Sequence, residues 1–467
     1  MLGRTRRVHF VGIGGIGMSG IAELLANLGY TVSGSDAKRS DATARLEATF
    51  GITVFEGHAA GNVGDADVVV FSSAVRPTNP EIVEATRRAI PVIPRAEMLA
   101  ELMRLRFAIT VAGSHGKTTT TSMIALVLEQ AGLDPTAVIG GRLSAFGSNA
   151  RLGQGEYMVA EADESDRSFL MLWPSIAVMT NIDHEHMESY GTFADLQQAF
   201  ADFANKVPFY GGVVACADDP SLAAVFPRLK RKLVTYGLVS RDAHYIGSGV
   251  ELGAFGGRCF VERRTAKGLE RLGTLELIVP GRHNLQNALA AVAAGEMVGL
   301  DFARIAGALR GFHGAERRFE RHGEVNGVMV IDDDGHHPTE IAAVLSAARA
   351  TLGRRLVVAF QPHRYSRTQQ LLEQFGPSFR EADEIVLADI YAASEEPIPG
   401  VTVEALAAAI ARGSGKPVHV AKQLDEVLSA VVGLAKPGDA VITLGAGSIG
   451  SLPKRVVAAL RDRTVAR

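Results

Sequence analysis

Val111-Ala-Gly-Ser-His-Gly-Lys-Thr-Thr-Thr-Thr-Ser122 is the stretch that decides the fold of this chain. It follows an apolar, β-branched run, residues 107–111, which predicts a buried parallel strand, and it leads into residues 123–129, which predict a helix. In a strand, glycine turn and helix of this kind, the N–H groups of the turn and the helix N-terminus point at a bound anion. The stretch therefore predicts a phosphate-binding loop in an α/β fold.

Two side chains at the end of this loop favour ATP as its ligand. Lys117 adds a positive charge, and the hydroxyl of Thr118 would lie on the Mg²⁺ that a polyphosphate carries. The spacing departs from the common P-loop, because Gly113 lies only three residues before Gly116. A glycine turn with a surface lysine is the alternative, which the position of Lys-Thr between strand and helix disfavours. The predicted ATP contacts in the loop are Gly113, Ser114, His115, Gly116, Lys117, Thr118 and Thr119.

Size and composition are those of an ordinary globular enzyme. The 467 residues exceed what one hydrophobic core organises, so we expect about three domains. A net charge of -3 gives no reason to expect nucleic acid or a membrane as a partner. The two cysteines, Cys216 and Cys259, allow neither a disulfide framework nor a cysteine zinc site. With no signal-like start and no run of about 18 apolar residues, the sequence predicts a cytoplasmic protein.

The N-terminal region carries a second glycine loop. Gly12-x-Gly14-x-x-Gly17 lies between a predicted strand, residues 8–11, and a predicted helix, and the next strand, residues 31–36, ends in an acid. These features match the Rossmann fingerprint, in which the glycines admit a pyrophosphate and the acid binds a ribose hydroxyl. A third strand, residues 66–71, ends in small serines. The pattern predicts a nucleotide diphosphate ligand, but it does not separate NAD from a UDP-sugar.

Acidic residues end a strand of the central region. Residues 157–161 predict a strand that leads into Glu161-Ala-Asp-Glu-Ser-Asp166. Mg²⁺ prefers carboxylate, hydroxyl and water oxygens, so this run predicts a magnesium site beside the phosphate loop; a solvated acidic loop is the alternative. A further strand, residues 176–181, precedes Asp183-His184-Glu185-His186. Two histidines at i,i+2 without a third soft ligand do not make a zinc site, so we expect one of them at a second Mg²⁺.

The C-terminal region repeats strand, loop and helix. Strands are predicted at residues 328–331, 356–360 and 440–444, and polar residues follow each of them. Such repeats predict a parallel sheet covered on both faces, with ligands at the carboxyl ends of its strands. Arg364 and Arg367 are spaced i,i+3, so they can share one helix face and bind a phosphate or carboxylate. The alternative is that both are surface arginines.

The order of these parts resembles the Mur ligases. Eight motifs in the family's order, spread over nearly the full chain, carry the resemblance: residues 9–20, 72–74, 95–99, 112–120, 161–166, 208–211, 335–340 and 361–367. The resemblance implies three α/β domains. These are an N-terminal Rossmann-like UDP-sugar-binding domain (1–105), a central P-loop ATPase-type domain with a mostly parallel sheet (106–312) and a C-terminal Rossmann-like amino-acid-binding domain (313–467).

The resemblance also implies a reaction. In it, ATP phosphorylates the lactyl carboxylate of UDP-N-acetylmuramate, and the amine of L-alanine attacks the acyl phosphate in peptidoglycan precursor synthesis. ATP and Mg²⁺ are then the cofactors, the partners are these two substrates rather than nucleic acid or a membrane, and the protein is a monomer or weak homodimer. A related family member that adds a whole tripeptide is the main alternative. An NAD-dependent oxidoreductase leaves Lys117 and Thr118 unexplained, and a non-catalytic ligand sensor would not need them.

Roles for individual residues follow from the same resemblance. Lys117 would hold the β- and γ-phosphates, Thr118 and Glu161 one Mg²⁺, and His186 a second. Further ATP contacts would be Asn284, Arg318 and Asp333, and the reacting groups would meet His337, Arg364 and Arg367. The UDP-sugar would be held by Gly14, Gly15, Ile16, Gly17, Met18, Ser19, Asp36, Ser72, Ser73 and Arg95. From its local sequence alone, Arg95 reads as a surface or capping residue.

The chain departs from the family pattern at three positions. Asp334 stands where the family usually has tyrosine, which puts a third carboxylate beside Asp332 and Asp333. Like charges at this range raise a carboxyl pKa or recruit a cation, so we expect weaker binding of ATP or alanine. His184 and Gly61 also depart from the usual residues, and we expect minor effects from both.

Overall fold

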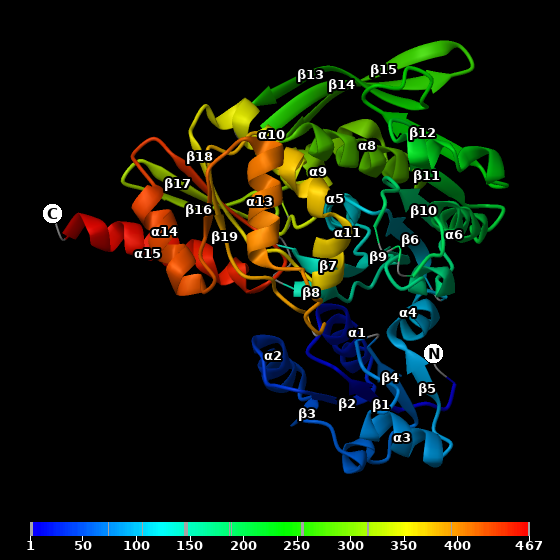
Figure 1. The fold of residues 1–467 in the computed structure, drawn as a ribbon. Helices are drawn as coiled ribbons and strands as arrows, with labels where there is room; N and C mark the ends of the chain where they lie inside the picture. Colours follow the sequence, from blue (N-terminus) through cyan, green and yellow to red (C-terminus); the bar gives the residue numbers. More distant parts are fainter. Residues whose placement is uncertain are drawn as a thin grey trace. The chain divides into compact units, whose positions relative to one another are not determined.

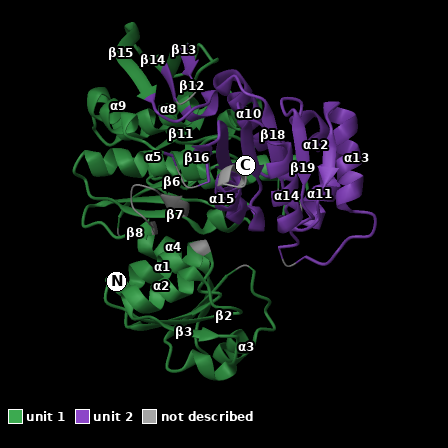
Figure 2. Ribbon diagram, turned by 90° about the vertical axis from the view of Figure 1, so that its left-hand side faces the viewer, with its two compact units in different colours: residues 1–249, 259–276, 285–313 green, residues 250–258, 277–284, 314–467 purple. Residues whose placement is uncertain are grey.

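The computed structural model describes residues 3–72, 74–104, 106–143, 148–185, 187, 189–253, 256–314, 317–393 and 395–465. Its elements form three sheets, which Figure 1 colours in chain order. The chain divides into two compact units (Figure 2). Unit 1 comprises residues 1–249, 259–276 and 285–313, and unit 2 comprises residues 250–258, 277–284 and 314–467. The predicted α/β fold is confirmed.

The first sheet has five parallel strands in the order β3-β2-β1-β4-β5. The strands are β1 (Arg7–Val11), β2 (Thr31–Asp36), β3 (Thr53–Glu56), β4 (Val68–Phe71) and β5 (Val92–Pro94). Its helices are α1 (Ile16–Asn27), α2 (Asp41–Phe50), α3 (Pro80–Arg87) and α4 (Arg95–Met103). From β1 the chain adds β2 and β3 on one side and then β4 and β5 on the other. The glycine loop after β1 therefore lies at a topological switch point, where such sheets bind nucleotides.

The central sheet has ten strands in the order β15-β14-β13-β12-β11-β10-β6-β9-β7-β8. The strands are β6 (Phe107–Ala112), β7 (Thr136–Leu143), β8 (Ser148–Arg151), β9 (Tyr157–Glu161), β10 (Ile176–Met179), β11 (Gly212–Cys216), β12 (Leu233–Gly237), β13 (Tyr245–Gly253), β14 (Gly256–Thr265) and β15 (Gly268–Leu277). β6 pairs in parallel with both β9 and β10, so the loops after these three strands meet at one edge. Of these strands, β6, β9 and β10 were predicted from the sequence, and β7, β8 and β11 to β15 were not.

The helices of the central region are α5 (Lys117–Gln130), α6 (Phe193–Asn205), α7 (Pro220–Ala223), α8 (Arg282–Met297) and α9 (Phe302–Arg310). α5 is buried from Thr119 to Leu128, which explains why its sequence has no polar face. α6 begins at a capping box, in which the Thr192 hydroxyl accepts the Asp195 N–H and the Asp195 carboxylate accepts the Thr192 N–H.

The third sheet has six strands in the order β16-β17-β21-β18-β19-β20. The strands are β16 (Glu320–Val325), β17 (Val328–Asp333), β18 (Leu356–Phe360), β19 (Glu384–Leu387), β20 (Val418–Val420) and β21 (Ala440–Leu444). β16 runs antiparallel to β17 at one edge, and the other strands are parallel.

The described helices of this region are α10 (Pro338–Leu352), α11 (Tyr365–Gln370), α12 (Leu372–Ser378), α13 (Val403–Ser414), α14 (Leu424–Leu434) and α15 (Leu452–Val465). One apolar core joins alternate strand residues to α10, α12 and α13, and a second joins the remaining strand residues to α14 and α15. The predicted sheet with both faces covered is confirmed.

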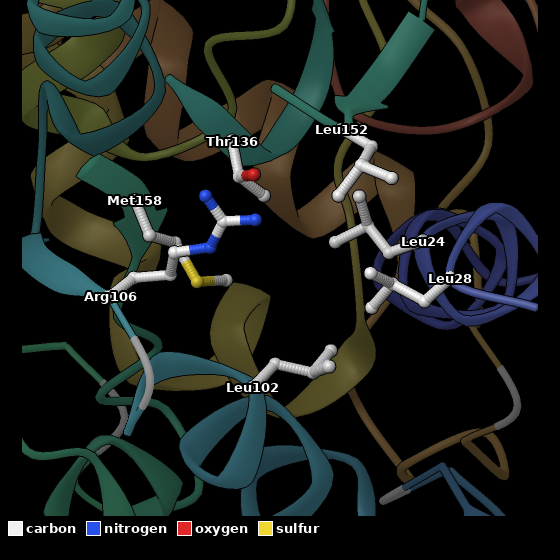
Figure 3. A pocket seen from close by; sticks show the side chains of 7 residues that line it. All are labelled: Leu24, Leu28, Leu102, Arg106, Thr136, Leu152 and Met158. Carbon is white, nitrogen blue, oxygen red and sulfur yellow. The ribbon is translucent and has the colours of Figure 1, made fainter. Parts of the chain in front are cut away.

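A small, mostly apolar pocket lies in unit 1 where α1 and α4 meet strands of the central sheet (Figure 3). It is lined by Leu24, Leu28, Leu102, Arg106, Thr136, Leu152 and Met158. None of the predicted site residues lines this pocket. Separately, no helix among the described residues has both the length and the apolar character that crossing a membrane requires.

Candidate active site

The predicted phosphate loop joins β6 to α5, and two glycines fix its path. Gly113 has φ +145°, and a Cβ at this position would lie 1.9 Å from Thr180 Oγ1. Gly116 has φ +80°, directly before the first residue of α5, and a Cβ there would lie 2.8 Å from Asn287 Oδ1. A side chain at either position would therefore clash, and the positive φ values favour glycine. Lys117 and Thr118 begin the helix, as predicted from their place after the glycine turn.

The loop after β10 holds the phosphate loop from the side. Asn181 Oδ1 accepts the His115 N–H at 2.8 Å, and Asn181 Nδ2 donates to His115 O at 3.1 Å. The Thr180 hydroxyl donates to His115 O at 2.6 Å. Asp183 accepts a hydrogen bond from His115 Nε2 at 2.9 Å and donates its N–H to Ser114 Oγ at 2.8 Å. The sequence analysis did not assign Thr180, Asn181 or Asp183, although polar residues at a strand end were the available signal.

Lys117 lies among oxygen atoms. Its ammonium donates to Gly113 O at 2.6 Å, Ser114 O at 3.2 Å and Glu164 Oε1 at 2.8 Å. Burial alone would lower the pKa of Lys117, but the carboxylates of Glu164, Asp163 and Glu161 raise it above its ordinary value. Lys117 therefore carries a positive charge at neutral pH.

Two of the predicted metal ligands lie side by side. The Thr118 hydroxyl donates to the Glu161 carboxylate, at 3.0 Å from Oε2 and 3.3 Å from Oε1. A hydroxyl and a carboxylate beside a lysine and a helix N-terminus are hard oxygen ligands next to an anion site, which fits Mg²⁺. The third predicted ligand, His186, lies outside the described residues.

Two further acids follow Glu161. Glu164 is 1% exposed, burial raises its pKa above the ordinary value, and its carbonyl accepts a hydrogen bond from the Tyr190 hydroxyl at 2.6 Å. Burial would also raise the pKa of Asp163, but the charge of Lys117, hydrogen bonds from Ser165 and the charge of Arg95 lower it. Asp163 Oδ2 lies 3.8 Å from Arg95 Nη2. The sequence analysis quoted both acids without separating their roles.

In the first sheet, Asp36 and Arg95 both touch the glycine loop. Asp36 Oδ2 accepts the Gly14 N–H at 2.8 Å. A Cβ at Gly17 would lie 2.5 Å from Arg95 Nη1, so the guanidinium lies against the loop. Met18 and Ser19 are buried in α1, and Gly15 precedes that helix. Ser72 follows β4, and its N–H donates to Val11 O at 3.2 Å. Ser73 and the side chain of Ile16 lie outside the described residues.

A buried network of polar side chains, centred on Glu81, lies next to this glycine loop. Glu81 is fully buried and accepts hydrogen bonds from Ser35 Oγ at 2.5 Å and Asn62 Nδ2 at 2.7 Å, with His9 Nε2 at 3.3 Å. Burial would raise the pKa of Glu81, but the hydrogen bonds with His9, Ser35 and Asn62 lower it below its ordinary value. The Ser35 carbonyl accepts the N–H groups of residues 12 and 13. The sequence analysis did not find Glu81, since a lone acid in a helix gives no signal.

In unit 2, Asp333 ends β17 and accepts two backbone hydrogen bonds. Its Oδ1 accepts the Gly335 N–H at 2.7 Å, and its Oδ2 accepts the Phe319 N–H at 2.8 Å. Burial raises the pKa of Asp333 to about 7. Asn284, the other predicted ATP contact near a helix start, is buried and donates to Pro280 O at 2.7 Å.

Asp334 is paired with arginines. Its Oδ1 lies 2.8 Å from Arg317 Nη1, and its Oδ2 lies 3.9 Å from Arg318 Nη2. Arg317 also binds Asp332 at 2.7 Å, and Arg318 lies 3.6 Å from Glu340. Guanidinium groups within the same unit thus lie beside the clustered carboxylates, Arg317 next to both Asp332 and Asp334. The cation that Asp334 recruits is arginine.

The loop after β18 carries the two predicted arginines. Arg364 directly precedes α11 and has φ +72° and ψ 140°, which is strained for a residue with a side chain. Arg367 Nη1 lies 3.3 Å from His363 Nδ1, and the His363 ring stacks on Tyr391 with centroids 5.5 Å apart. Burial, with nearby His336, Arg367 and Arg364, lowers the pKa of His363 to about 3, so this ring is neutral.

His337 is 1% exposed and precedes α10, where its side chain accepts the Thr339 N–H at 3.4 Å. It therefore acts as a helix cap in this structure. Its predicted role beside the reacting groups stays a prediction.

Known protein families match this chain along most of its length. Three family models match it: "Mur ligase family, catalytic domain" over residues 7–107, "Mur ligase middle domain" over residues 111–295 and "Mur ligase, glutamate ligase domain" over residues 317–447. A UDP-N-acetylmuramate--L-alanine ligase of Geobacter sp. (strain M21) is 52% identical over 462 residues, which are 99% of each chain.

Solved structures agree with this result. The crystal structure of UDP-N-acetylmuramate-alanine ligase from Thermotoga maritima has a TM-score of 0.82 and 30% identity, covering 98% of this chain and 99% of that one. A murein peptide ligase from Psychrobacter arcticus has a TM-score of 0.73 and 26% identity, with the same coverage.

Proposed function

Because this chain belongs to the Mur ligase family, we propose that it joins L-alanine to the lactyl carboxylate of UDP-N-acetylmuramate, with conversion of ATP to ADP and phosphate. The observation that carries the proposal is the 52% identity, over 99% of both chains, to a relative named for this activity. The reaction would supply a peptidoglycan precursor. We propose that the reaction takes place in the cytoplasm, as the family resemblance implies.

The reaction has two steps. A carboxylate oxygen of the lactyl group attacks the γ-phosphorus of ATP, the bond to the β,γ-bridging oxygen breaks, and ADP leaves with the electron pair. The free amine of L-alanine then attacks the carbonyl carbon of the acyl phosphate, loses a proton, and phosphate leaves from the tetrahedral intermediate. Positioning and neutralisation of charge supply most of the catalysis in such phosphoryl transfers.

The central region would bind the nucleotide. Lys117, charged and at the start of α5, suits the β- and γ-phosphates, and the N–H groups of the glycine loop would complete the cradle. Thr118 and Glu161 lie 3.0 Å apart and would hold one Mg²⁺, which supplies charge neutralisation when bound. His186 is proposed at a second Mg²⁺ on the family resemblance alone.

The other two regions would bind the reacting partners. In the first sheet, Asp36 and Arg95 touch the glycine loop, which supports a UDP-sugar site there. In unit 2, Arg364 and Arg367 are proposed to face the reacting carboxyl group or the alanine carboxylate. Arg318, Asp333 and Asn284 are proposed as further ATP contacts.

The second candidate is a ligase that adds a whole tripeptide to the same sugar nucleotide. It is supported by the likeness to the Psychrobacter arcticus murein peptide ligase, but that likeness is weaker, at 26% identity and a TM-score of 0.73. The alanine ligase of Thermotoga maritima reaches 30% and 0.82 over the same share of this chain. An NAD-dependent oxidoreductase is not supported, because the family assignment explains the first glycine loop as a UDP site.

Phosphate release tests the proposal. The protein is incubated with ATP, Mg²⁺ and UDP-N-acetylmuramate, and L-alanine is compared with the tripeptide L-Ala-γ-D-Glu-diaminopimelate. We expect release with L-alanine and none when the sugar nucleotide is omitted, and Lys117→Ala should abolish it. Release with the tripeptide only would move the protein to the second candidate.

A further inference from the structure

The ammonium of Lys117 makes three hydrogen bonds within the protein. It donates to Gly113 O, Ser114 O and Glu164 Oε1, at 2.6, 3.2 and 2.8 Å. A lysine ammonium has three N–H donors, and these three acceptors use all of them. A phosphate can therefore reach Lys117 only by replacing one of these partners.

The two carbonyl partners belong to a fixed loop. Gly113 lies so close to Thr180 that a Cβ there would be 1.9 Å from its hydroxyl. The Ser114 N–H donates to Asn181 O at 3.2 Å, and Ser114 Oγ accepts the Asp183 N–H at 2.8 Å. Among the described residues, the Glu164 side chain hydrogen-bonds Lys117 and no other side chain, so we take it as the partner that a phosphate replaces.

Glu164 is an unusual partner for a phosphate-binding lysine. It is 1% exposed, and within the described part of the chain its second oxygen, Oε2, has no hydrogen-bond partner. Its backbone is held by the hydrogen bond from Tyr190 to its carbonyl. A buried carboxylate needs a compensating cation, and here that cation is Lys117.

We propose that Glu164 is a positioning residue that occupies Lys117 in place of the terminal phosphates and releases it when a nucleotide binds. The inference rests on the proposed function, since it takes ATP as the ligand of this loop. With a nucleotide in place, Glu164 loses its cation and faces a second negative group. Its charge therefore opposes nucleotide binding, and it recaptures Lys117 when ADP leaves.

Glu164→Gln tests the proposal because it removes the charge and keeps the shape. Titration calorimetry of the full chain with Mg²⁺ would compare ADP with adenosine. We expect ADP to bind roughly tenfold more tightly to the variant, which corresponds to about 1.4 kcal/mol, with adenosine unchanged. The KM for ATP should fall by a similar factor, whereas kcat should not rise. A purely structural role would weaken both ligands together.

Glu156→Gln is the matched control. It makes the same chemical change on an exposed residue at the other end of β9, away from Lys117, and should leave ADP affinity unaltered. If both the wild type and this control bind ADP but Glu164→Gln gives the same affinity, the proposal is wrong. If neither binds ADP, the proposed function fails.

Acylation of Lys117 tests the proposal even if neither protein binds ADP. The rate of modification by an N-hydroxysuccinimide ester, followed by peptide mass spectrometry, is compared with that of exposed Lys267 in the same sample. We expect Lys117 to react several-fold faster in Glu164→Gln, because its partner has lost its charge. An equal rate in both proteins overturns the proposal whether or not nucleotide binds.

Discussion

The effect of the Asp334 charge depends on the arginines that it contacts. Asp334 lies 3.9 Å from Arg318, a proposed ATP contact, and 2.8 Å from Arg317. We predict that Asp334→Asn and Asp334→Tyr each lower the KM for ATP several-fold, because Arg318 loses the carboxylate of Asp334 as a neighbour. Stability should change by only about 0–1 kcal/mol, since the pair is partly exposed.

Steady-state kinetics at saturating L-alanine and UDP-N-acetylmuramate would measure this effect. Asp242→Asn, an exposed change in unit 1, controls for net charge. An unaltered KM for ATP in both position-334 variants would remove Asp334 as a determinant of nucleotide binding.

The two cysteines give a second prediction at this scale. Cys216 and Cys259 are each 1% exposed, and burial raises the pKa of each thiol to about 12. Since the thiolate is the reactive form, neither should react with a disulfide reagent at pH 8 in the folded protein. Both should react once the protein is unfolded in concentrated urea. Rapid reaction of one thiol in the native protein would contradict the buried position.

Single-residue roles could be predicted only where position in the sequence implies position in space. Thr118 and Glu161 each follow a predicted strand, so their closeness was predictable. The acid run 161–166 does not reveal which acid is buried, and the pairing of Glu164 with Lys117 was therefore missed. The partner of Asp334 depends on how β16 and its preceding loop lie against β17, which composition does not encode.

At the scale of elements, the end of β10 supports the phosphate loop. The Asn181 side chain makes two hydrogen bonds to the backbone of His115. We predict that Asn181→Ala weakens ADP binding roughly tenfold, because the loop N–H groups lose their alignment, with each lost hydrogen bond worth about 0.5–1.5 kcal/mol. Calorimetric titration with ADP measures it.

Asn205→Ala is the control for that change. Its amide also bonds two backbone groups, Arg228 O and the Lys230 N–H, but at the end of α6. It should lower stability by a similar amount without altering ADP affinity. Equal loss of affinity in both variants would mean that global destabilisation, rather than the loop, causes the effect.

The apolar strands next to the phosphate loop were predicted, whereas β11 was missed although it is apolar and fully buried. β6, β9 and β10 are short apolar runs, because they are buried on both faces of the sheet. β15 is mostly exposed and carries charged residues, and β13 is exposed towards its end, so both lack the apolar signal of a buried strand. The apolar run predicted a helix over residues 123–129. α5 begins earlier, at Lys117, and the threonines before the apolar run are also helical and mostly buried.

At the scale of the whole molecule, the sequence predicts three domains, and the chain forms three sheets within two compact units. The first sheet and most of the central sheet belong to unit 1. The expectation of three domains came from the chain length and from the resemblance to the family. Neither gives the packing between the sheets, which depends on contacts such as that of Arg95 with Asp163.

This ion pair connects the two proposed ligand sites of unit 1. Arg95 lies against Gly17 of the first glycine loop, and Asp163 lies in the acid run beside Lys117. We predict that Asp163→Asn tightens UDP-N-acetylmuramate binding by up to about fivefold in the absence of ATP, because a half-exposed pair is worth about 0–1 kcal/mol and its loss frees Arg95 for the pyrophosphate. Asp166→Asn, an exposed change in the same loop, should have no such effect.

A double-mutant cycle separates this link from a general change in charge. Arg95→Ala should weaken sugar-nucleotide binding, and adding Asp163→Asn to it should change nothing further, because the arginine that the carboxylate restrains is gone. If Asp163→Asn tightens binding equally in both backgrounds, the carboxylate acts through the field of the whole loop and not through Arg95. If Asp163→Asn has no effect in the Arg95→Ala background, Arg95 is the residue through which a bound sugar nucleotide alters the charge beside Lys117. The coupling between the two ligands would then have to be reciprocal.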